Sequence, residues 1–182
     1  YYSIMENIIS YENTIRSLIR TVPDFPKPGV LFYDITTLLK TSQGLKAALE
    51  AMAYQTLDLN FSKIAAIEAR GFIFASSLAQ MLGKGLVLIR KKGKLPGTTH
   101  SIQYGLEYGS DTLEISDLAV DKGEELLIID DVLATGGTAK ASCELIEKIG
   151  GQVSACLFLM ELSNLKGESM IAPRKVKSVI KL

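Results

Sequence analysis

Two adjacent carboxylates and a run of small residues follow an apolar stretch late in the sequence. Residues 126–138 read Leu-Leu-Ile-Ile-Asp-Asp-Val-Leu-Ala-Thr-Gly-Gly-Thr. The glycines let backbone N–H groups curl round a phosphate, the threonine hydroxyls add donors, and the N-terminus of a following helix adds partial positive charge. Asp130 and Asp131 would repel that phosphate, so we expect them to face sugar hydroxyls or a cation. The segment therefore predicts a site for a phosphorylated sugar.

Other interpretations of this segment fit less well. A TGGT sequence alone is more typical of a solvated turn with a threonine N-cap, but two acids directly after an apolar strand favour a ligand site. A Walker A loop would need Lys-Ser or Lys-Thr directly after its second glycine, and the segment lacks the GxGxxG pattern of a dinucleotide site. We therefore expect neither of these nucleotide sites.

Basic residues gather at two further points. Arg70 follows a short apolar segment that ends at Ile67, where a tight loop could aim backbone N–H groups and a guanidinium at a pyrophosphate. The alternative for Arg70 is a surface ion pair with Glu68. The second point is a run of four cations in five positions: Arg90, Lys91, Lys92 and Lys94. Such a run is usually a solvated surface, but in a chain with no net charge it also fits a site for a highly charged ligand.

Apolar strands and helices alternate along most of the chain. Strands are expected at Ile64–Ile67, Gly85–Ile89, Leu126–Ile129 and Val153–Leu159. Helices are expected before Pro23, over about 43–57, from Phe72 to Leu82 and from Thr138 to Ile149. Strands that are apolar on both faces and separated by helices indicate an α/β fold, with a parallel β-sheet flanked by helices on both faces. With 182 residues, 47% of them hydrophobic, we expect a single domain over residues 1–182.

Residues 91–122 break this alternation. They are rich in Gly, Thr, Ser and charge, with weak alternation only around Thr112–Ile115. A segment this long without clear secondary structure is usually functional in a compact domain. We predict a lid over 91–122 that contains a β-ribbon.

Composition limits the kinds of partner. Twenty basic and twenty acidic residues balance, so no global field draws the chain to nucleic acid or to a membrane. Cys143 and Cys156 lack metal-site spacing, and we expect no disulfide between them, which suits a reducing cytosol. There is no uninterrupted apolar run of about 18 residues and no charged segment before an apolar core near the start, so we expect a cytoplasmic protein that neither spans a membrane nor is secreted.

With these features the sequence resembles the type I phosphoribosyltransferases, whose signature is a hydrophobic strand, two acids and a TGGT-type loop for the ribose 5-phosphate. Further segments resemble the adenine-specific branch of that family: residues 25–36 (FPKPGVLFYDIT), 68–72 (EARGF), 90–97 (RKKGKLPG), 106–109 (LEYG) and 165–167 (LKG). The resemblance covers nearly the whole chain in the family's order. It implies the type I phosphoribosyltransferase fold, with a flexible lid at 91–122 and a small N-terminal hood for the base within residues 1–36.

The resemblance also implies roles for individual residues. Binding of 5-phosphoribosyl 1-pyrophosphate is implied for Glu68, Ala69, Arg70, Arg90, Lys91, Lys94, Tyr108, Asp130, Asp131, Ala134, Thr135, Gly136, Gly137 and Thr138. Adenine binding is implied for Leu31, Phe32 and Tyr33, although on sequence alone an aromatic residue at Phe32 is more often part of a core. Tyr33 stands where many relatives carry Arg, so a backbone contact would survive there and a side-chain contact would not.

The implied catalytic acid or base is Glu107, because its Leu-Glu-Tyr-Gly context matches the family's catalytic residue. His100 is the only histidine, but it lies at a position that the family does not use. The resemblance further implies a cis peptide bond between Glu68 and Ala69.

The implied reaction is displacement of pyrophosphate from the ribose by a ring nitrogen of adenine. Mg²⁺ is the expected cofactor, bound mainly through the pyrophosphate and ribose of the substrate rather than by dedicated side chains. The resemblance implies a homodimer in which some of the basic residues reach the neighbouring subunit. Two alternatives remain: transfer to another purine (hypoxanthine, guanine or xanthine), or a non-catalytic regulator that binds nucleic acid. The residues before Asp24 are too few for a winged DNA-binding domain.

Overall fold

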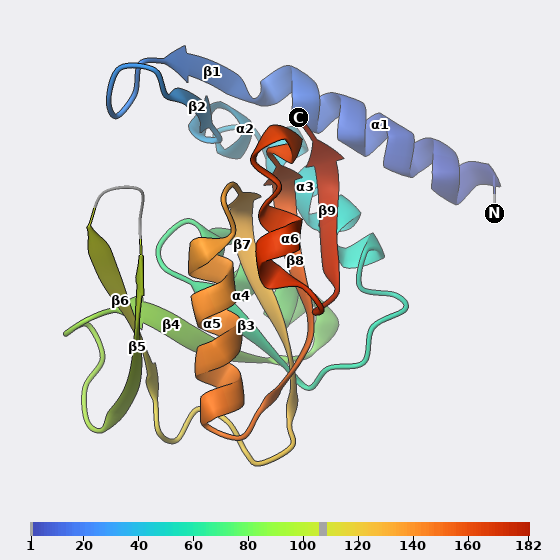
Figure 1. The fold of residues 1–182 in the computed structure, drawn as a ribbon. Helices are drawn as coiled ribbons and strands as arrows, with labels where there is room; N and C mark the ends of the chain where they lie inside the picture. Colours follow the sequence, from blue (N-terminus) through green and yellow to red (C-terminus); the bar gives the residue numbers. More distant parts are fainter. Residues whose placement is uncertain (1, 106–108) are drawn as a thin grey trace. The chain divides into compact units, whose positions relative to one another are not determined.

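Figure 1 traces the computed structural model of the chain, in which residues 2–105 and 109–182 are described, with side chains from Glu6 onward. Contacts within the chain group into two units, Tyr1–Tyr54 and Gln55–Leu182. The single domain expected over residues 1–182 stays a prediction. No helix in the described part of the chain is long and apolar enough to cross a membrane.

The first unit combines three helices with a two-stranded hairpin. Its elements are α1 (Tyr2–Leu18), β1 (Arg20–Pro23), β2 (Leu31–Asp34), α2 (Thr36–Leu39) and α3 (Ser42–Tyr54). The two predicted helices are confirmed as α1 and α3, which pack against each other. The strands of the hairpin are antiparallel, and the proline-rich segment forms the connection between them. This hairpin was not predicted.

Asp34 holds the end of that hairpin to the start of α2. Its Oδ1 accepts hydrogen bonds from the Thr36 backbone N–H (2.8 Å) and hydroxyl (2.6 Å), and its Oδ2 pairs with Arg20 Nη2 at 2.7 Å. The bonds from Thr36, assisted by Arg20, lower the pKa of Asp34 to about 2. The carboxylate is therefore charged throughout the physiological range.

The second unit is built on one seven-stranded sheet with the order β5-β6-β4-β3-β7-β8-β9 (Figure 1). Its strands are β3 (Lys63–Ile67), β4 (Gly85–Lys91), β5 (Thr99–Gly105), β6 (Ser110–Ser116), β7 (Glu125–Leu133), β8 (Gln152–Glu161) and β9 (Val176–Lys181). The five neighbouring strands β4, β3, β7, β8 and β9 pair in parallel. β5 and β6 form an antiparallel ribbon, and β6 joins the sheet antiparallel to the end of β4. The mostly parallel α/β sheet confirms the predicted fold class.

Helices cover both faces of this sheet. The helices are α4 (Gly71–Leu82), α5 (Gly137–Lys148) and α6 (Gly167–Ile171), with a short 3₁₀ turn at Ser163–Leu165. α4 packs on β3 and β7. α5 packs on the opposite face, where its buried residues form one hydrophobic cluster with sheet residues such as Ala65, Ile128 and Val87. Gly83, with φ of +63°, ends α4 where the sequence predicts it.

Three strands extend further than predicted at their carboxyl ends: β4, β7 and β8, the last of which was expected over Val153–Leu159 and runs from Gln152 to Glu161. β4 continues through Lys91, and β7 continues through Asp130 and Asp131 to Leu133. The reason is pairing that local sequence does not reveal: β8 runs beside β7 as far as the pair Leu133–Glu161. The expectation that Asp130 and Asp131 follow the end of their strand is therefore wrong.

The segment 91–122 contains the predicted ribbon. β5 and β6 pair from Thr99–Ser116 to Gly105–Ser110. Leu113 and Ile115 on β6 are buried in the core, so this strand is anchored as part of the sheet. Movement of the segment stays a prediction, and the predicted site residues Glu107 and Tyr108 lie outside the described residues.

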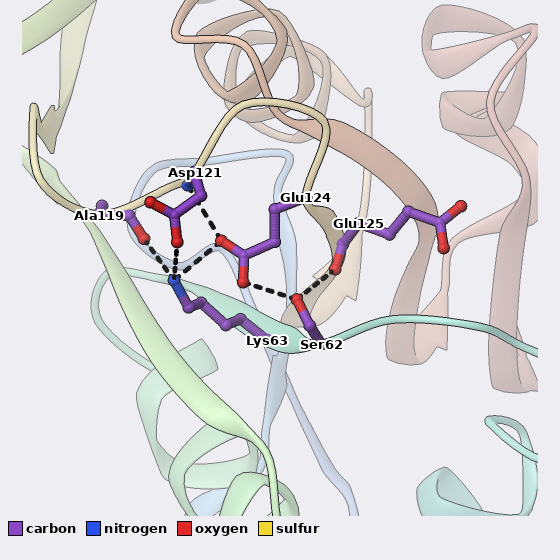
Figure 2. Close-up of polar contacts among 6 residues, drawn as sticks. All are labelled: Ser62, Lys63, Ala119, Asp121, Glu124 and Glu125. Atoms are coloured by element: carbon purple, nitrogen blue, oxygen red, sulfur yellow. Dashed lines mark hydrogen bonds and ion pairs between the residues drawn. The ribbon is translucent and has the colours of Figure 1, made fainter.

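A cluster of polar contacts lies at the amino end of the sheet (Figure 2). Lys63 Nζ donates to Glu124 Oε2 at 2.8 Å and to the Ala119 carbonyl at 3.3 Å, with Asp121 Oδ2 4.0 Å away. Ser62 donates its hydroxyl to the other Glu124 oxygen at 2.7 Å. Burial alone would raise the pKa of Glu124, but the bonds from Lys63 and Ser62 outweigh it and lower that pKa. These contacts fasten the loop before β7 to the start of β3.

Candidate active site

A pocket of about 240 Å³ opens at the carboxyl ends of β3, β4 and β7. Ligands of open parallel sheets bind at this edge. Residues predicted from the sequence that line it are Glu68, Ala69, Arg70, Lys91, Asp130, Asp131, Ala134, Thr135, Gly136, Gly137 and Thr138. The structure thus brings together segments that lie far apart in the sequence.

Asp130 and Asp131 bring two carboxylates to the edge of this pocket. Asp130 Oδ1 accepts a hydrogen bond from the Asp131 backbone N–H at 2.8 Å, and Asp131, only 2% exposed, pairs through Oδ2 with Arg70 Nε at 2.9 Å. Burial, reinforced by the neighbouring charge of Asp131, raises the pKa of Asp130 well above its usual range. Burial also raises the pKa of Asp131, although Arg70 opposes this effect. Two carboxylates in this environment are poised to accept hydroxyl hydrogens or approach a cation.

The loop after β3 is held against the ends of two strands. Glu68 Oε2 accepts hydrogen bonds from the Lys91 backbone N–H at 2.9 Å and from Arg90 Nε at 3.3 Å. The bond from Lys91 is the main reason that the pKa of Glu68 is lowered. Arg70 Nε forms an ion pair with Asp131 Oδ2, and Glu68 pairs with Arg90. The peptide bond between Glu68 and Ala69 is cis, as predicted.

The segment Ala134–Thr138 forms the predicted phosphate loop at the start of α5 and lines the pocket. Gly136, the N-cap of α5, has φ of +87° and no side-chain cap, so the alternative of a threonine-capped turn is wrong. A Cβ on Gly136 would lie 2.5 Å from the Gly167 carbonyl oxygen, and a Cβ on Gly167 would lie 2.3 Å from that of Ala134. Both positions therefore require glycine, which explains the Leu-Lys-Gly segment near the end of the chain. The helix N-terminus carries partial positive charge toward an anion.

Several pocket residues were not predicted: Tyr104, Leu113, Val132, Leu133, Ala139 and Phe158. Tyr104 is the polar member with a direct link to the phosphate loop, because its hydroxyl accepts a hydrogen bond from Thr138 Oγ1 at 3.4 Å. The sequence held a signal for it, since Ile102 and Tyr104 alternate with polar residues and both pack on the core.

The basic run 90–94 divides between two environments. Lys91 lines the pocket and pairs with Asp111, whereas the Arg90 guanidinium donates to the Lys94 carbonyl at 3.0 Å and lies 6.0 Å from the centre of the Phe72 ring. Arg90 and Lys94 are not among the residues that line this pocket. Their role in substrate binding stays a prediction.

The three residues predicted to bind adenine lie on β2 in the first unit. The rings of Phe25 and Phe32 meet edge to face with centroids 5.0 Å apart. Leu31 on β2 is 48% exposed and Phe25 in the connection before it is 50% exposed, so the hairpin presents apolar surface suited to a purine. The part played by Leu31, Phe32 and Tyr33 stays a prediction.

Comparison with known proteins agrees with this site. Residues 36–181 match the family model of the phosphoribosyl transferase domain, the class that the sheet, the paired carboxylates and the loop define. An adenine phosphoribosyltransferase of Acidobacterium capsulatum is 48% identical over 166 residues, which are 91% of this chain and 92% of the relative. The chain belongs to the adenine phosphoribosyltransferase family.

Solved structures give the same result. The crystal structure of the adenine phosphoribosyltransferase from Thermoanaerobacter pseudethanolicus superposes with a TM-score of 0.92 at 46% identity, covering 94% of this chain and 99% of the other. The enzyme from Saccharomyces cerevisiae, complexed with an imino-altritol bisphosphate and adenine, has a TM-score of 0.88 at 34% identity, with coverage of 94% and 99%.

Proposed function

We propose that the chain transfers adenine to 5-phosphoribosyl 1-pyrophosphate, giving AMP and pyrophosphate. A ring nitrogen of adenine forms the bond to the anomeric carbon, the bond to pyrophosphate breaks, and adenine loses a proton. The observation that carries this proposal is one pocket that joins two adjacent carboxylates, Asp130 and the buried Asp131, to a glycine loop at a helix N-terminus. The Saccharomyces cerevisiae relative, whose crystal structure is a complex with adenine and a bisphosphate, supports adenine as the base.

In this proposal the residues act by binding and positioning. The loop Ala134–Thr138 holds the 5-phosphate, Asp130 and Asp131 accept hydrogen bonds from the ribose hydroxyls, and cations including Arg70 hold the pyrophosphate. The ribose gains positive character in the transition state, which the nearby carboxylates stabilise. No side chain has to act as a nucleophile, because orientation of the two substrates and electrostatics suffice for the displacement.

Mg²⁺ fits this pocket as a cofactor carried by the substrate. The chain offers two carboxylates there, and Mg²⁺ is commonly bound through one or two carboxylates together with substrate phosphates. We expect Asp130 and Asp131 to approach the ion through the ribose hydroxyls, with most of its ligands coming from the substrate. When bound, Mg²⁺ would offset the charge of the leaving pyrophosphate.

We expect the chain to form a homodimer and to act in the cytoplasm. Leu86 and Leu88 on β4, which are 40% and 37% exposed, and Leu118, which is 89% exposed, present apolar side chains at the surface of the second unit. An apolar surface of this kind suits a second copy of the chain. Sedimentation of the wild-type chain beside Leu88→Lys tests this, since a monomeric wild type would contradict it.

The decisive test is pyrophosphate release dependent on adenine, measured with and without Mg²⁺. We expect release with adenine and Mg²⁺, and little release when hypoxanthine, guanine or xanthine replaces adenine. Faster release with one of those purines would reassign the base. Absence of release with every base, together with a shift of nucleic acid in a gel, would favour the regulator.

Glu107 has its own test. Glu107→Gln should lower turnover by roughly 10²- to 10⁴-fold, the usual effect of losing a positioned acid or base, while affinity for 5-phosphoribosyl 1-pyrophosphate stays nearly unchanged. Normal turnover would make Glu107 a solvated residue. Equal losses of turnover and affinity would instead indicate failed closure of the segment 91–122.

A further inference from the structure

Lys91 lies in the pocket with its ammonium group already engaged. It pairs with Asp111 Oδ2, and the other oxygen of that carboxylate accepts a hydrogen bond from the Thr112 backbone N–H at 2.8 Å. The side chain of Asp111 is 23% exposed and that of Lys91 is 51% exposed. The bond from Lys91 lowers the pKa of Asp111, and the same contact raises the pKa of Lys91, so both groups carry charge at neutral pH. Asp111 itself is not among the residues that line the pocket.

The position of Asp111 links this pair to the ribbon. Asp111 is the second residue of β6, and its partner across the ribbon is Tyr104, which reaches the phosphate loop through Thr138. β6 joins the rest of the sheet at Lys91 and its neighbour, through the pairs Arg90–Glu114 and Lys91–Leu113. The ribbon therefore reaches the phosphate loop through Tyr104 and the pocket-lining Lys91 through Asp111.

We propose that Asp111 is a positioning residue that holds Lys91 and competes with the pyrophosphate group of the substrate for its ammonium. The inference rests on the proposed function, because it assumes a ligand that carries pyrophosphate. Lysine is a point charge on a flexible chain, so it can move from a carboxylate to a phosphate without a fixed geometry. Because the Lys91–Asp111 pair must be loosened when pyrophosphate binds, Asp111 lowers affinity for this group and favours its release.

The test measures binding of two probes in the presence of Mg²⁺: 5-phosphoribosyl 1-pyrophosphate and inorganic pyrophosphate. Asp111→Asn should bind both about 2- to 5-fold more tightly than wild type, as expected from removing a half-exposed ion pair that competes with the ligand. The KM for adenine should not change, whereas a general disturbance of the site would change it. Asp117→Asn is the matched control, because Asp117 is an exposed acid beyond the other end of β6. It should bind both probes like wild type.

A double-mutant cycle separates competition for Lys91 from the loss of a nearby negative charge. In a Lys91→Met background, Asp111→Asn should give no gain in affinity, because the cation for which Asp111 competes is gone. A gain that persists in that background, or a single variant that binds no more tightly than wild type, would overturn the proposal. Wild-type chain that binds neither probe would instead overturn the proposed function, and the inference with it. If Asp111→Asn lost cooperative unfolding, Asp111→Ser would replace it throughout the cycle.

Discussion

Glu124 and the pair Asp130 and Asp131 lie at opposite ends of the same sheet, and their pKa values shift in opposite directions. At the amino end, Glu124 receives Lys63 on one oxygen and Ser62 on the other, and its pKa is lowered. At the carboxyl end, Asp130 and Asp131 are adjacent, burial raises both of their pKa values, and Arg70 pairs with Asp131. The contacts of Glu124 at the amino end therefore stabilise the fold. Asp130 and Asp131 at the carboxyl end lie where burial disfavours their charged forms, and a bound ligand could stabilise those forms.

This difference determines how stability at each end responds to pH. The pKa of Glu124 is lower in the folded chain, so its stabilisation is present above the unfolded value and is lost as pH falls through the folded value. The pKa of Asp131 is higher in the folded chain, so its contribution is present below the unfolded value and is lost as pH rises through the folded value. Ionisation of Asp131 in the folded chain therefore costs stability.

The largest expected effect is at the carboxyl end. Asp131→Asn should weaken binding of 5-phosphoribosyl 1-pyrophosphate by about 1.5 to 3 kcal/mol, or roughly 10- to 150-fold, because a charge-assisted contact to the substrate is lost. The free energy of unfolding at pH 7 should change little, because two effects oppose each other. Asparagine resembles the protonated acid that burial favours, whereas the ion pair with Arg70 is lost. Calorimetric titration and thermal unfolding of the same sample measure the two quantities.

Glu124→Gln is the matched control for that variant. It should lower the free energy of unfolding by about 1 kcal/mol through loss of the bond to Lys63, and leave substrate affinity unchanged. An Asp131→Asn chain that loses cooperative unfolding while still binding substrate would make Asp131 a structural residue and erase the contrast between the ends.

Two glycines with positive φ sharpen the comparison further. Gly136→Ala should cost about 1 to 2 kcal/mol from the left-handed backbone, and the clash with Gly167 should displace the phosphate loop and weaken substrate binding as well. Gly123 at the amino end has φ of +80° with open space where a Cβ would lie. Gly123→Ala should therefore lower the free energy of unfolding only through the left-handed backbone. Equal substrate affinity in the two variants would show that packing against Gly167 does not shape the loop.

A smaller effect is expected when stability is followed as a function of pH. Lys63→Met removes the charge that holds Glu124, so about 0.5 to 1 kcal/mol of stability should disappear at pH 7. The difference from wild type should shrink as pH falls toward and below the usual range of a glutamate, because Glu124 is then neutral in both proteins. Urea unfolding at several pH values measures this, and a constant difference would point to packing instead of charge.

The smallest effect is expected at Tyr104. The hydrogen bond from Thr138 is long, so Tyr104→Phe should raise the KM for 5-phosphoribosyl 1-pyrophosphate by only about 2- to 5-fold. The KM for adenine and the thermal stability should remain at their wild-type values. Steady-state kinetics on this variant beside Tyr104→Leu separates the hydroxyl from the ring, and a wild-type KM in both variants would remove Tyr104 from the site.

Features with a local signal could be predicted from the sequence. The apolar run of β7 and the glycines after it identify the strand and the phosphate loop, because each depends on a few consecutive residues. Gly83 marks the end of α4 for the same reason. The cis bond at Glu68–Ala69 was foreseen from the resemblance, not from any physical signal in the chain.

Features that arise from distant pairing could not be predicted. The ion pair of Arg70 with Asp131 joins the start of α4 to β7, and the course of β7 past Asp130 depends on β8 lying beside it. Cys143 and Cys156 are another case: both are buried free thiols whose Sγ atoms lie 3.4 Å apart, although their spacing in the sequence gives no sign of contact. Such contacts follow from the assembled sheet and have no local signature.

Every residue that lines the pocket falls between Glu68 and Phe158, within the unit Gln55–Leu182. The residues that the family resemblance connects with the base, Leu31 to Tyr33, belong to the unit Tyr1–Tyr54. Recombination between related genes at the junction of Tyr54 and Gln55 would therefore pass on these pocket residues together while replacing the segment that the resemblance connects with the base. On the proposed function, a change of base preference would then be inherited separately from the residues expected to hold the ribose.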